Sequence, residues 1–317
     1  MASVRVMTQN LYVGTEFRQL FAATSLPEVL ASVDAEFAAV SRTDPAARAD
    51  AMAAIAARRE PHLVALQEVA TWRTGPDAGC QDVAFDFLRS LLSGLDARGR
   101  RYRVAAESEV WALASPGASG RWVRLEVRNV VLAAGDVRVS AARGLQFAAK
   151  REILTPGLPP VDLPRGVTLC VANVEGALFA FANTHLEEAT MPDVQVAQAE
   201  ELLATVDLEQ SLVLAGDFNS AAEGGSLASP TYERLLAAGL VDVWRAASSE
   251  ADGSTWGQAN DVANPISTLD QRLDLVLVAG GIRPVSIERV GHLAEDRTPS
   301  GLWPSDHAGL VADLEVD

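Results

Sequence analysis

The chain contains few cysteine, histidine and aromatic residues. Its 317 residues include 2 cysteines and 4 histidines, and 6% are aromatic. So few cysteines exclude a disulfide scaffold, and few Cys and His residues together disfavour a zinc site. Cys80 lies in a loop rich in glycine and proline, and Cys170 lies inside an apolar strand. A buried free thiol is favoured for Cys170, although one disulfide between the two cysteines stays open.

Long hydrophobic runs are also missing. No apolar stretch reaches the length of a membrane span, and no charged segment followed by an apolar one marks a signal peptide. We therefore expect no transmembrane segment. The location stays open between a cytoplasmic protein, as the chain stands, and a secreted one whose leader has been removed.

Positive charge is scarce. There are 26 Lys and Arg residues against 42 Asp and Glu residues, which gives a formal net charge of −16. Duplex DNA is held mainly by Lys and Arg contacts to phosphates, so the charge disfavours it as a partner. Four arginines cluster within residues 98–103, where we expect a solvated helix end and strand start. With 49% hydrophobic residues and no repeat or linker, we expect one monomeric domain over residues 1–317.

The hydrophobic pattern predicts helices alternating with strands and hairpins. Helices are predicted over residues 27–40, 45–59 (with Asp44 as N-cap), 85–95, 192–206 and 231–238. Strands are predicted over 4–8, 63–66, 101–106, 109–113, 122–127, 129–134, 167–173, 177–183, 211–216, 273–278, 284–290 and 308–315. Residues 71–81, 155–166, 220–230 and 251–268 are expected to be loops. This order favours a four-layer α/β sandwich, with two mixed β-sheets packed face to face and helices on both outer faces.

Polar residues follow several of the apolar strands directly. They are Asn10, Glu68, His185, Asp217 with Asn219, Asp274, and Asp306 with His307. In layered α/β proteins, strand ends are where chemistry is usually mounted. Acids, amides and imidazoles without cysteine suit a hard divalent cation and a phosphate ester.

These residues lie in short motifs that occur in a fixed order along nearly the whole chain. The motifs are Gln9-Asn10, Leu66-Gln67-Glu68-Val69, Asn183-Thr184-His185-Leu186, Gly216-Asp217-Phe218-Asn219, Arg272-Leu273-Asp274 and Ser305-Asp306-His307. In this set and order the chain resembles the endonuclease/exonuclease/phosphatase superfamily, which includes deoxyribonuclease I-like and neutral sphingomyelinase-like metal-dependent phosphoesterases.

The resemblance implies a role for each matched residue. Glu68 would be the principal ligand of Mg²⁺ or Mn²⁺, Asn10 would add an amide oxygen, and Asp306 would be a second carboxylate near the metal. Hard cations favour such oxygen ligands. One metal ion or two, and Mg²⁺ or Mn²⁺, stay open.

The remaining matched residues would act on water and phosphate. Asp217 would orient or deprotonate the attacking water, and Asn219 would hold the water or a phosphate oxygen. His307 would stabilise charge on a phosphate oxygen, with Asp274 fixing its tautomer. His185 would contact phosphate or assist the leaving oxygen.

One further residue and the loops bear on substrate choice. Asn129 resembles a strand position near the phosphate in relatives. Residues 71–81, 114–121, 155–166, 220–230 and 251–268 would rim the site. Trp72, Trp256 and Trp303 lie near these loops, where they either pack or stack on a substrate.

We therefore expect a metal-dependent phosphoric ester hydrolase, foremost a phosphodiesterase that cleaves P–O bonds by in-line attack of water. A small diester or a lipid headgroup is favoured as substrate. A nuclease, a sphingomyelinase-like phospholipase C and a phosphomonoesterase remain alternatives. The complete set of key residues argues against a non-catalytic binding module.

Overall fold

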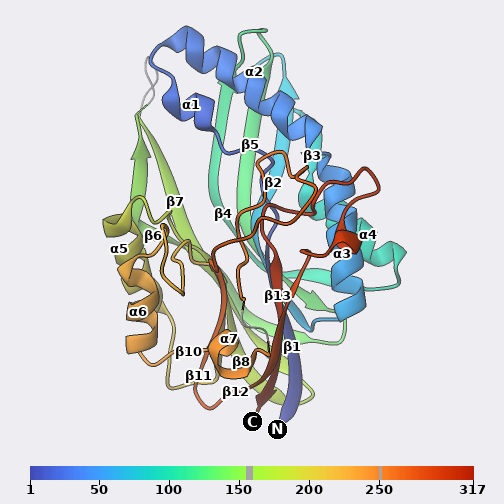
Figure 1. The fold of residues 1–317 in the computed structure, drawn as a ribbon, viewed down its shortest axis with the longest axis vertical. Coiled ribbons are helices and arrows are strands. Elements are labelled where there is room, and N and C mark those ends of the chain that lie inside the picture. The colour runs from blue at the N-terminus through green and yellow to red at the C-terminus, as the bar shows by residue number, and fades with distance from the viewer. Residues whose placement is uncertain (155–159, 250–251) are drawn as a thin grey trace.

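Two mixed β-sheets pack face to face in a computed structural model that describes residues 1–154, 160–249 and 252–317 (Figure 1). The first sheet has the order β12 (Arg283–Val290), β13 (Gly309–Val316), β1 (Ala2–Asn10), β2 (Leu63–Gly75), β5 (Trp122–Ala134) and β4 (Tyr102–Pro116), and β3 (Asp82–Asp86) pairs with β2. The second has the order β10 (Val241–Asp242), β11 (Asp274–Ala279), β9 (Leu212–Asp217), β8 (Ala177–His185), β7 (Val161–Val174) and β6 (Arg138–Ile153).

Helices cover the outer faces of both sheets, which confirms the predicted four-layer sandwich (Figure 1). The first sheet carries α2 (Leu26–Arg42), α3 (Pro45–Arg59) and α4 (Phe87–Ala97), and the second carries α5 (Pro192–Thr205) and α6 (Pro230–Ala237). Short helices α1 (Arg18–Ala22), α7 (Val243–Ala247) and a 3-10 turn (Ala294–Asp296) complete the described helices. No helix of the described residues is long and apolar enough to cross a membrane.

Three hydrophobic cores fill the three interfaces between the four layers. Strand β2 shows how one strand serves two of them. Leu63 and Ala65 pack between the sheets, whereas Val64 and Leu66 pack under the helices, because successive side chains of a strand point to opposite faces. A strand buried on both faces must be apolar throughout, which is why this segment could be predicted as a short continuous run.

Several local predictions also agree with the structure. Asp44 caps α3 by accepting a hydrogen bond from the Ala47 amide at 3.2 Å, and Pro45 is the first helical residue. Cys80 and Cys170 are both buried and free, so they form no disulfide. The clustered arginines lie between α4 and β4, where Arg98 pairs with Asp50 at 2.6 Å.

Several predictions of local structure were wrong. Residues 71–75 continue β2 instead of forming a loop, and α4 begins at Phe87 because β3 occupies the residues before it. Strand β6 was missed because it lies at a sheet edge with mostly exposed side chains and shows no apolar alternation.

The predicted loop over residues 155–166 needs a similar correction. Residues 155–159 lie outside the described part of the chain, but β7 begins at Val161. Pro164 is tolerated in this strand because β7 pairs only with β6 there, and pairing with β8 begins at Gly166.

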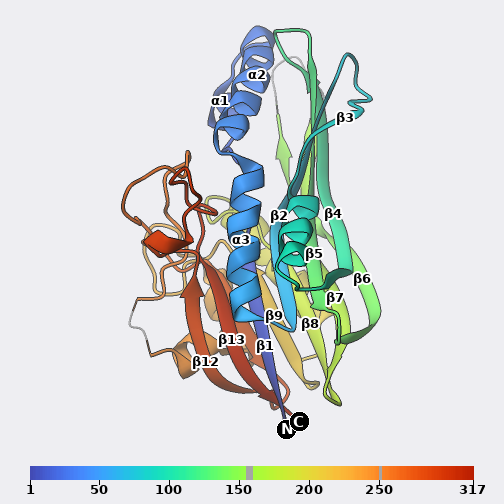
Figure 2. The ribbon, with the colours of Figure 1, turned by 90° about the vertical axis from the view of Figure 1, so that its right-hand side faces the viewer.

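Each sheet contains one pair of parallel strands, and these pairs decide where polar residues meet. In the first sheet β1 and β2 run parallel, with Asn10 opposite Gln67. In the second β8 and β9 run parallel, with His185 opposite Asp217. Strand β11 runs antiparallel to β9 and places Asp274 beside Asp217. The N- and C-termini lie together at the opposite end of the sandwich (Figures 1 and 2).

Candidate active site

A cleft of about 460 Å³ opens where the two parallel strand pairs end. Most of the predicted site residues line it, namely Glu68, His185, Asp217, Asn219, Asp306 and His307. Asn10 and Asp274 lie directly behind this lining, in hydrogen-bond contact with Asp217 and His307 respectively. The fold thus brings together residues that are far apart in the chain. The hydrogen bond from the Ser305 hydroxyl to the Asn10 carbonyl, for example, spans 295 positions.

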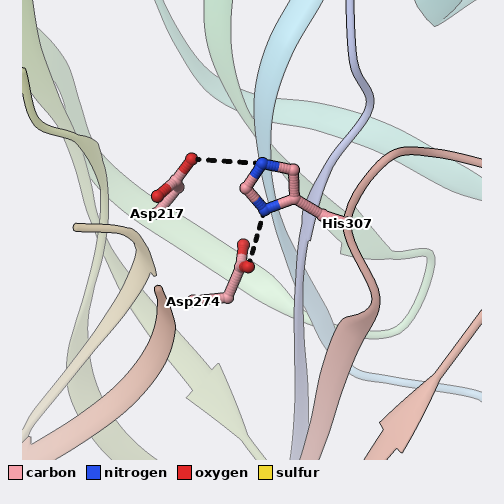
Figure 3. Close-up of side chains that lie close together, drawn as sticks. All are labelled: Asp217, Asp274 and His307. Carbon is pink, nitrogen blue, oxygen red and sulfur yellow. Dashed lines mark hydrogen bonds and ion pairs between the residues drawn. The ribbon is translucent and has the colours of Figure 1, made fainter. Parts of the chain in front are cut away.

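His307 connects the two sheets at the base of the cleft (Figure 3). It precedes β13 of the first sheet, and its Nδ1 lies 2.8 Å from an Asp274 carboxylate oxygen of the second sheet. Its Nε2 lies 3.8 Å from an Asp217 oxygen. Burial alone would lower the pKa of His307, but Asp274, Asp306 and Asp217 together raise it well above its ordinary value. The imidazole is therefore a cation at neutral pH.

His185 is the opposite case. Burial lowers its pKa first, and the neighbouring Arg165 and His307 charges lower it further, well below the ordinary value. The ring is therefore neutral. Its Nε2 lies 3.1 Å from Nδ2 of Asn219 and 3.5 Å from an Asp217 oxygen. One imidazolium and one neutral imidazole thus flank the same carboxylate.

Asp217 is buried and held by two donors. One oxygen accepts from the Asn10 amide at 3.0 Å, and the other accepts from the Asn219 backbone N–H at 2.9 Å. Burial raises the pKa of Asp217, while His307 and both hydrogen bonds oppose that change. Asn219 has a φ of 50°, and its side chain also donates to the Leu186 carbonyl at 3.0 Å. The result is an oriented carboxylate that can take a proton.

Glu68 reaches the cleft through an irregularity in β2. The pairing of β2 with β5 shifts between Leu66 and Val69, and Glu68 has a φ of 53°. A bulge of this kind re-aims a side chain out of the regular alternation. One Glu68 oxygen accepts from the Val13 N–H at 2.8 Å, and the side chain faces the cleft.

Asp306 is a buried acid that lies near another acid. Burial raises its pKa, His307 and Arg48 lower it, and the nearby Glu68 carboxylate adds to the increase; the result is a pKa of about 7. A buried acid near a second carboxylate indicates a place for a cation. Asn10 completes an all-oxygen donor set, although its Oδ1 already accepts from the Tyr12 N–H at 2.9 Å.

A buried arginine holds the loops that carry these acids. Arg48 donates to the carbonyls of Leu11 at 3.0 Å, Tyr12 at 3.1 Å and Pro304 at 3.2 Å. These carbonyls belong to the segments that follow Asn10 and precede Asp306. Burial lowers the pKa of Arg48 to about 10, so the side chain remains charged at neutral pH.

A second group of potential metal ligands is Asp217, Asp274 and His307, whose ligand atoms lie within 4.8 Å of one another. Here the positive charge is already supplied by the protonated His307, and its Nδ1 is bonded to Asp274. The oxygen set of Asn10, Glu68 and Asp306 is more loosely paired, with Asp306 4.0 Å from Nε2 of His307, and suits a hard divalent ion better.

Sequence reasoning missed several residues of the cleft. Nη1 of Arg165 lies 3.0 and 3.1 Å from the two ring nitrogens of His185, and its Nη2 lies 3.7 Å from a Glu187 oxygen. Glu187 is buried, and one of its oxygens has no hydrogen-bond partner among the described residues. The spacing of Glu187 two residues after His185 could have revealed it, as the spacing of Asn219 after Asp217 did. Arg165 was hidden in the predicted loop.

Other expected residues lie elsewhere. Asn129 does not line the cleft; it is fully buried in β5, with Nδ2 3.5 Å from the Gly166 carbonyl. Trp72 and Trp303 are buried packing residues, and Trp256 lines the cleft. Of the expected rim, residues 71–81 and 114–121 do not line the cleft, whereas Leu163, Arg165, Leu227 and Trp256 from the other expected segments do. Residues 12–18 and 187–190 were not expected there, and they supply much of the lining.

Comparison with known proteins gives one family. The profile of the endonuclease/exonuclease/phosphatase family matches residues 7–307. No curated protein sequence matches the chain.

Solved structures of similar fold cover the whole chain. An endonuclease/exonuclease/phosphatase from Beutenbergia cavernae is 21% identical with a TM-score of 0.64, covering 100% of this chain and 72% of its own. A mannosyl-6-phosphatase from Bacteroides thetaiotaomicron is 15% identical with a TM-score of 0.60, covering 98% and 99%. TDP2 from D. rerio, solved with a single-strand DNA product, is 13% identical with a TM-score of 0.60, covering 100% of both chains. At these identities the likeness concerns the fold.

Proposed function

The chain belongs to the endonuclease/exonuclease/phosphatase family, whose members are phosphoesterases, and we propose that it is a divalent-metal-dependent phosphodiesterase. The observation that supports this most is the single cleft that unites an oriented carboxylate, a neutral and a charged imidazole, and two further acids. Hydrolysis of a P–O bond by water needs a group that takes a proton and groups that stabilise negative charge at phosphorus.

Family enzymes generally use divalent metals, and the residues present fit such an ion. Glu68, Asp306 and Asn10 would hold Mg²⁺ or Mn²⁺, because Glu68 raises the pKa of the buried Asp306 and all three offer oxygen. When bound, the ion would neutralise charge on the phosphate and polarise the P–O bond.

The protein's own residues would perform the proton transfers. Asp217 would orient the attacking water and accept its proton, since its two donors fix the carboxylate and burial raises its pKa. His307 would donate a hydrogen bond from Nε2 to a non-bridging oxygen, while Asp274 holds the ring through Nδ1. Asn219 and the neutral His185 would contact the phosphate or the leaving oxygen.

The charge of the cleft favours a diester over a more strongly charged substrate. Its lining contains the cations Arg18, Arg151, Arg165 and His307 against the acids Glu16, Glu68, Glu187, Glu188, Asp217 and Asp306. A phosphodiester brings one negative charge, a monoester brings about 1.5 to 2 near neutral pH, and duplex DNA needs several basic contacts. A monoesterase and a nuclease are therefore secondary candidates, whereas a sphingomyelinase-like activity on a lipid diester is compatible with this charge.

The experiment is metal-dependent turnover across a substrate panel. The purified protein is assayed on bis(p-nitrophenyl) phosphate, p-nitrophenyl phosphate, sphingomyelin and plasmid DNA. EDTA should abolish hydrolysis, Mg²⁺ or Mn²⁺ should restore it, and the diester should give the highest kcat/KM among the chromogenic esters. Full activity in EDTA, or no turnover of any ester with either metal, would overturn the proposal.

A further inference from the structure

A second pocket, lined by carbon, opens beside the cleft. Its volume is about 90 Å³, and it lies beneath α1, between α2 and the strands of the first sheet. Phe17, Phe21, Trp111 and Leu163 belong to the walls of both the pocket and the cleft. The two spaces therefore adjoin at these four side chains.

The pocket offers no free polar group. Glu36 accepts a hydrogen bond from the Thr15 hydroxyl, and Ser115 donates to the Pro116 carbonyl at 3.2 Å. The Trp72 indole N–H donates to the Val13 carbonyl at 3.0 Å. These three polar side chains turn hydrogen-bonding atoms to partners within the chain, and the exposed lining is almost entirely carbon, so the pocket favours apolar surface and shape.

An aromatic cluster forms the wall next to the cleft. The Phe17 ring stacks on Trp72 with centroids 6.3 Å apart and meets the edge of Trp111 at 6.1 Å. Phe17 has a φ of 56°, a backbone conformation that is unfavourable for a bulky residue. Such strain persists where the surroundings enforce it, and it clusters at ligand sites.

Helix α1 covers the pocket without belonging to the core. It has no buried residue, and Phe21 is 41% exposed although its ring faces both spaces. The Arg151 guanidinium lies over the Phe21 ring, 5.1 Å from its centroid, and lines the cleft. At the boundary between the two spaces, the Arg151 guanidinium thus faces the cleft and the Phe21 ring faces the pocket.

We propose that this pocket is a specificity subsite that takes a compact apolar group of the phosphate ester bound in the cleft. The proposal rests on the proposed function for the position of the phosphate. A volume of about 150 Å³ holds benzene in an engineered protein cavity, so a space of about 90 Å³ that is open on one side suits a partly inserted phenyl ring or a short alkyl chain. The substrate class is therefore an ester that joins one phosphate to a carbon-rich group.

The test measures binding of three phosphonates that share one head group and cannot be hydrolysed at their P–C bond. Methyl-, phenyl- and hexylphosphonate are titrated calorimetrically into the protein in Mg²⁺. We expect phenyl- or hexylphosphonate to bind about 10- to 100-fold more tightly than methylphosphonate. A preference for phenyl identifies an aryl ester, and a preference for hexyl identifies a lipid-like alkyl ester.

Two variants alter the pocket by different means. Leu113→Gln places an amide in the wall, and Leu20→Trp fills the space from α1, where no residue is buried. Both should reduce the preference to less than about 3-fold while methylphosphonate binding stays unchanged. The matched control is Leu178→Gln in β8, which is 58% exposed and distant in the fold from the pocket, and it should retain the full preference.

The outcomes separate this proposal from the proposed function. Equal binding of all three phosphonates, or a preference that survives both pocket variants, would overturn the subsite. If the preference is found and lost as expected while no ester is hydrolysed with any metal, the subsite stands and the phosphodiesterase assignment fails. If diesters are hydrolysed but no phosphonate is preferred, the phosphodiesterase assignment stands and the subsite fails.

Discussion

The two sheets supply the cleft with acids in different electrostatic states. Asp217 and Asp274 of the second sheet flank His307, which is protonated and lies 2.8 Å from Asp274. Asp306, beside the first sheet, is buried and has a pKa of about 7, which Glu68 helps to raise and which His307 and Arg48 lower. It lies 4.0 Å from Nε2 of the same imidazole, so its pairing with a positive charge is looser than that of Asp274.

This difference separates two tasks within one cleft. The side that is internally paired can keep its geometry without a ligand, because its hydrogen bonds are formed within the chain. The side with the loosely paired acids gains most from an added cation, since a bound ion offsets their negative charge. Removing a group from each side should therefore have opposite effects on the stability of the metal-free protein.

The largest effect should follow Glu68→Gln. We expect turnover to fall by more than about 1,000-fold, beyond the roughly 10- to 100-fold cost of losing an outer hydrogen-bond partner of a metal ligand. Without metal, thermal unfolding should show an unchanged or higher Tm, because a like charge beside Asp306 is gone. The rise in Tm on adding Mg²⁺ should disappear.

Glu288→Gln is the matched control, because this glutamate lies on β12 and pairs with Arg59 at 3.1 Å, away from the cleft. It should keep both turnover and the Mg²⁺ response. A normal Mg²⁺-induced rise in Tm in Glu68→Gln would show that the cation binds elsewhere, and the cluster of Asp217, Asp274 and His307 would then be the first alternative.

The paired side is tested by a double-mutant cycle. His307→Ala should lower kcat by about 100- to 1,000-fold, the usual cost of losing one donor to a developing charge. Asp274→Asn should cost less, and the double variant should lose less than the product of the two single losses, since the two act as one unit. Multiplicative losses in kcat would show that the aspartate does not act through the histidine.

A polyanionic substrate tests the charge of the cleft, because it adds negative charge to a cleft with an excess of acids. We expect kcat/KM on plasmid DNA to be at least about 10-fold below that on bis(p-nitrophenyl) phosphate at physiological ionic strength. Plasmid nicking that is efficient, sensitive to salt and faster than diester turnover would place nuclease activity first.

The smallest effect concerns an acid that is paired outside the cleft. Asp313 lies on β13, seven residues after Asp306, and a carboxylate oxygen lies 2.7 Å from Nε of Arg5. Burial would raise the pKa of Asp313, but the hydrogen bonds from Arg5 and Ser286 lower it overall. Its stabilisation is therefore present above the unfolded pKa of about 3.9 and is lost as the pH falls through the lower folded value.

Asp313→Asn should accordingly reduce the free energy of unfolding by at most about 1 kcal/mol at pH 7, because the pair is partly exposed. The difference from the unaltered protein should shrink in acid, which urea denaturation at several pH values measures. The Mg²⁺ response should not change. A loss of that response would mean that acids along β13 are coupled to the cleft.

The sequence revealed the polar centre of the site because its residues stand at the ends of apolar strands. Glu68 and His185 each follow a run that the core requires, so their position in the fold could be read from the pattern. Their protonation could not be read, because it depends on neighbours from distant segments. His185 is neutral beside Arg165, and His307 is charged beside Asp274.

The rest of the cleft had no such pattern. Helix α1 is too short and too exposed to give a helical period, and β6 shows no apolar alternation. Leu113 and Phe17 resemble ordinary core residues in the sequence, and they become pocket walls only when α1 is placed over the first sheet. Position in three dimensions decides their role.

The hydrogen bond from the Ser305 hydroxyl to the Asn10 carbonyl, 2.7 Å long across 295 residues, has a consequence for biosynthesis. Asn10 and Glu68 leave the ribosome long before Asp306 and His307 do. Every nascent fragment that ends before residue 306 lacks the imidazolium and the second acid. The activity should therefore appear in a single step, once β13 has been made and pairs with β1.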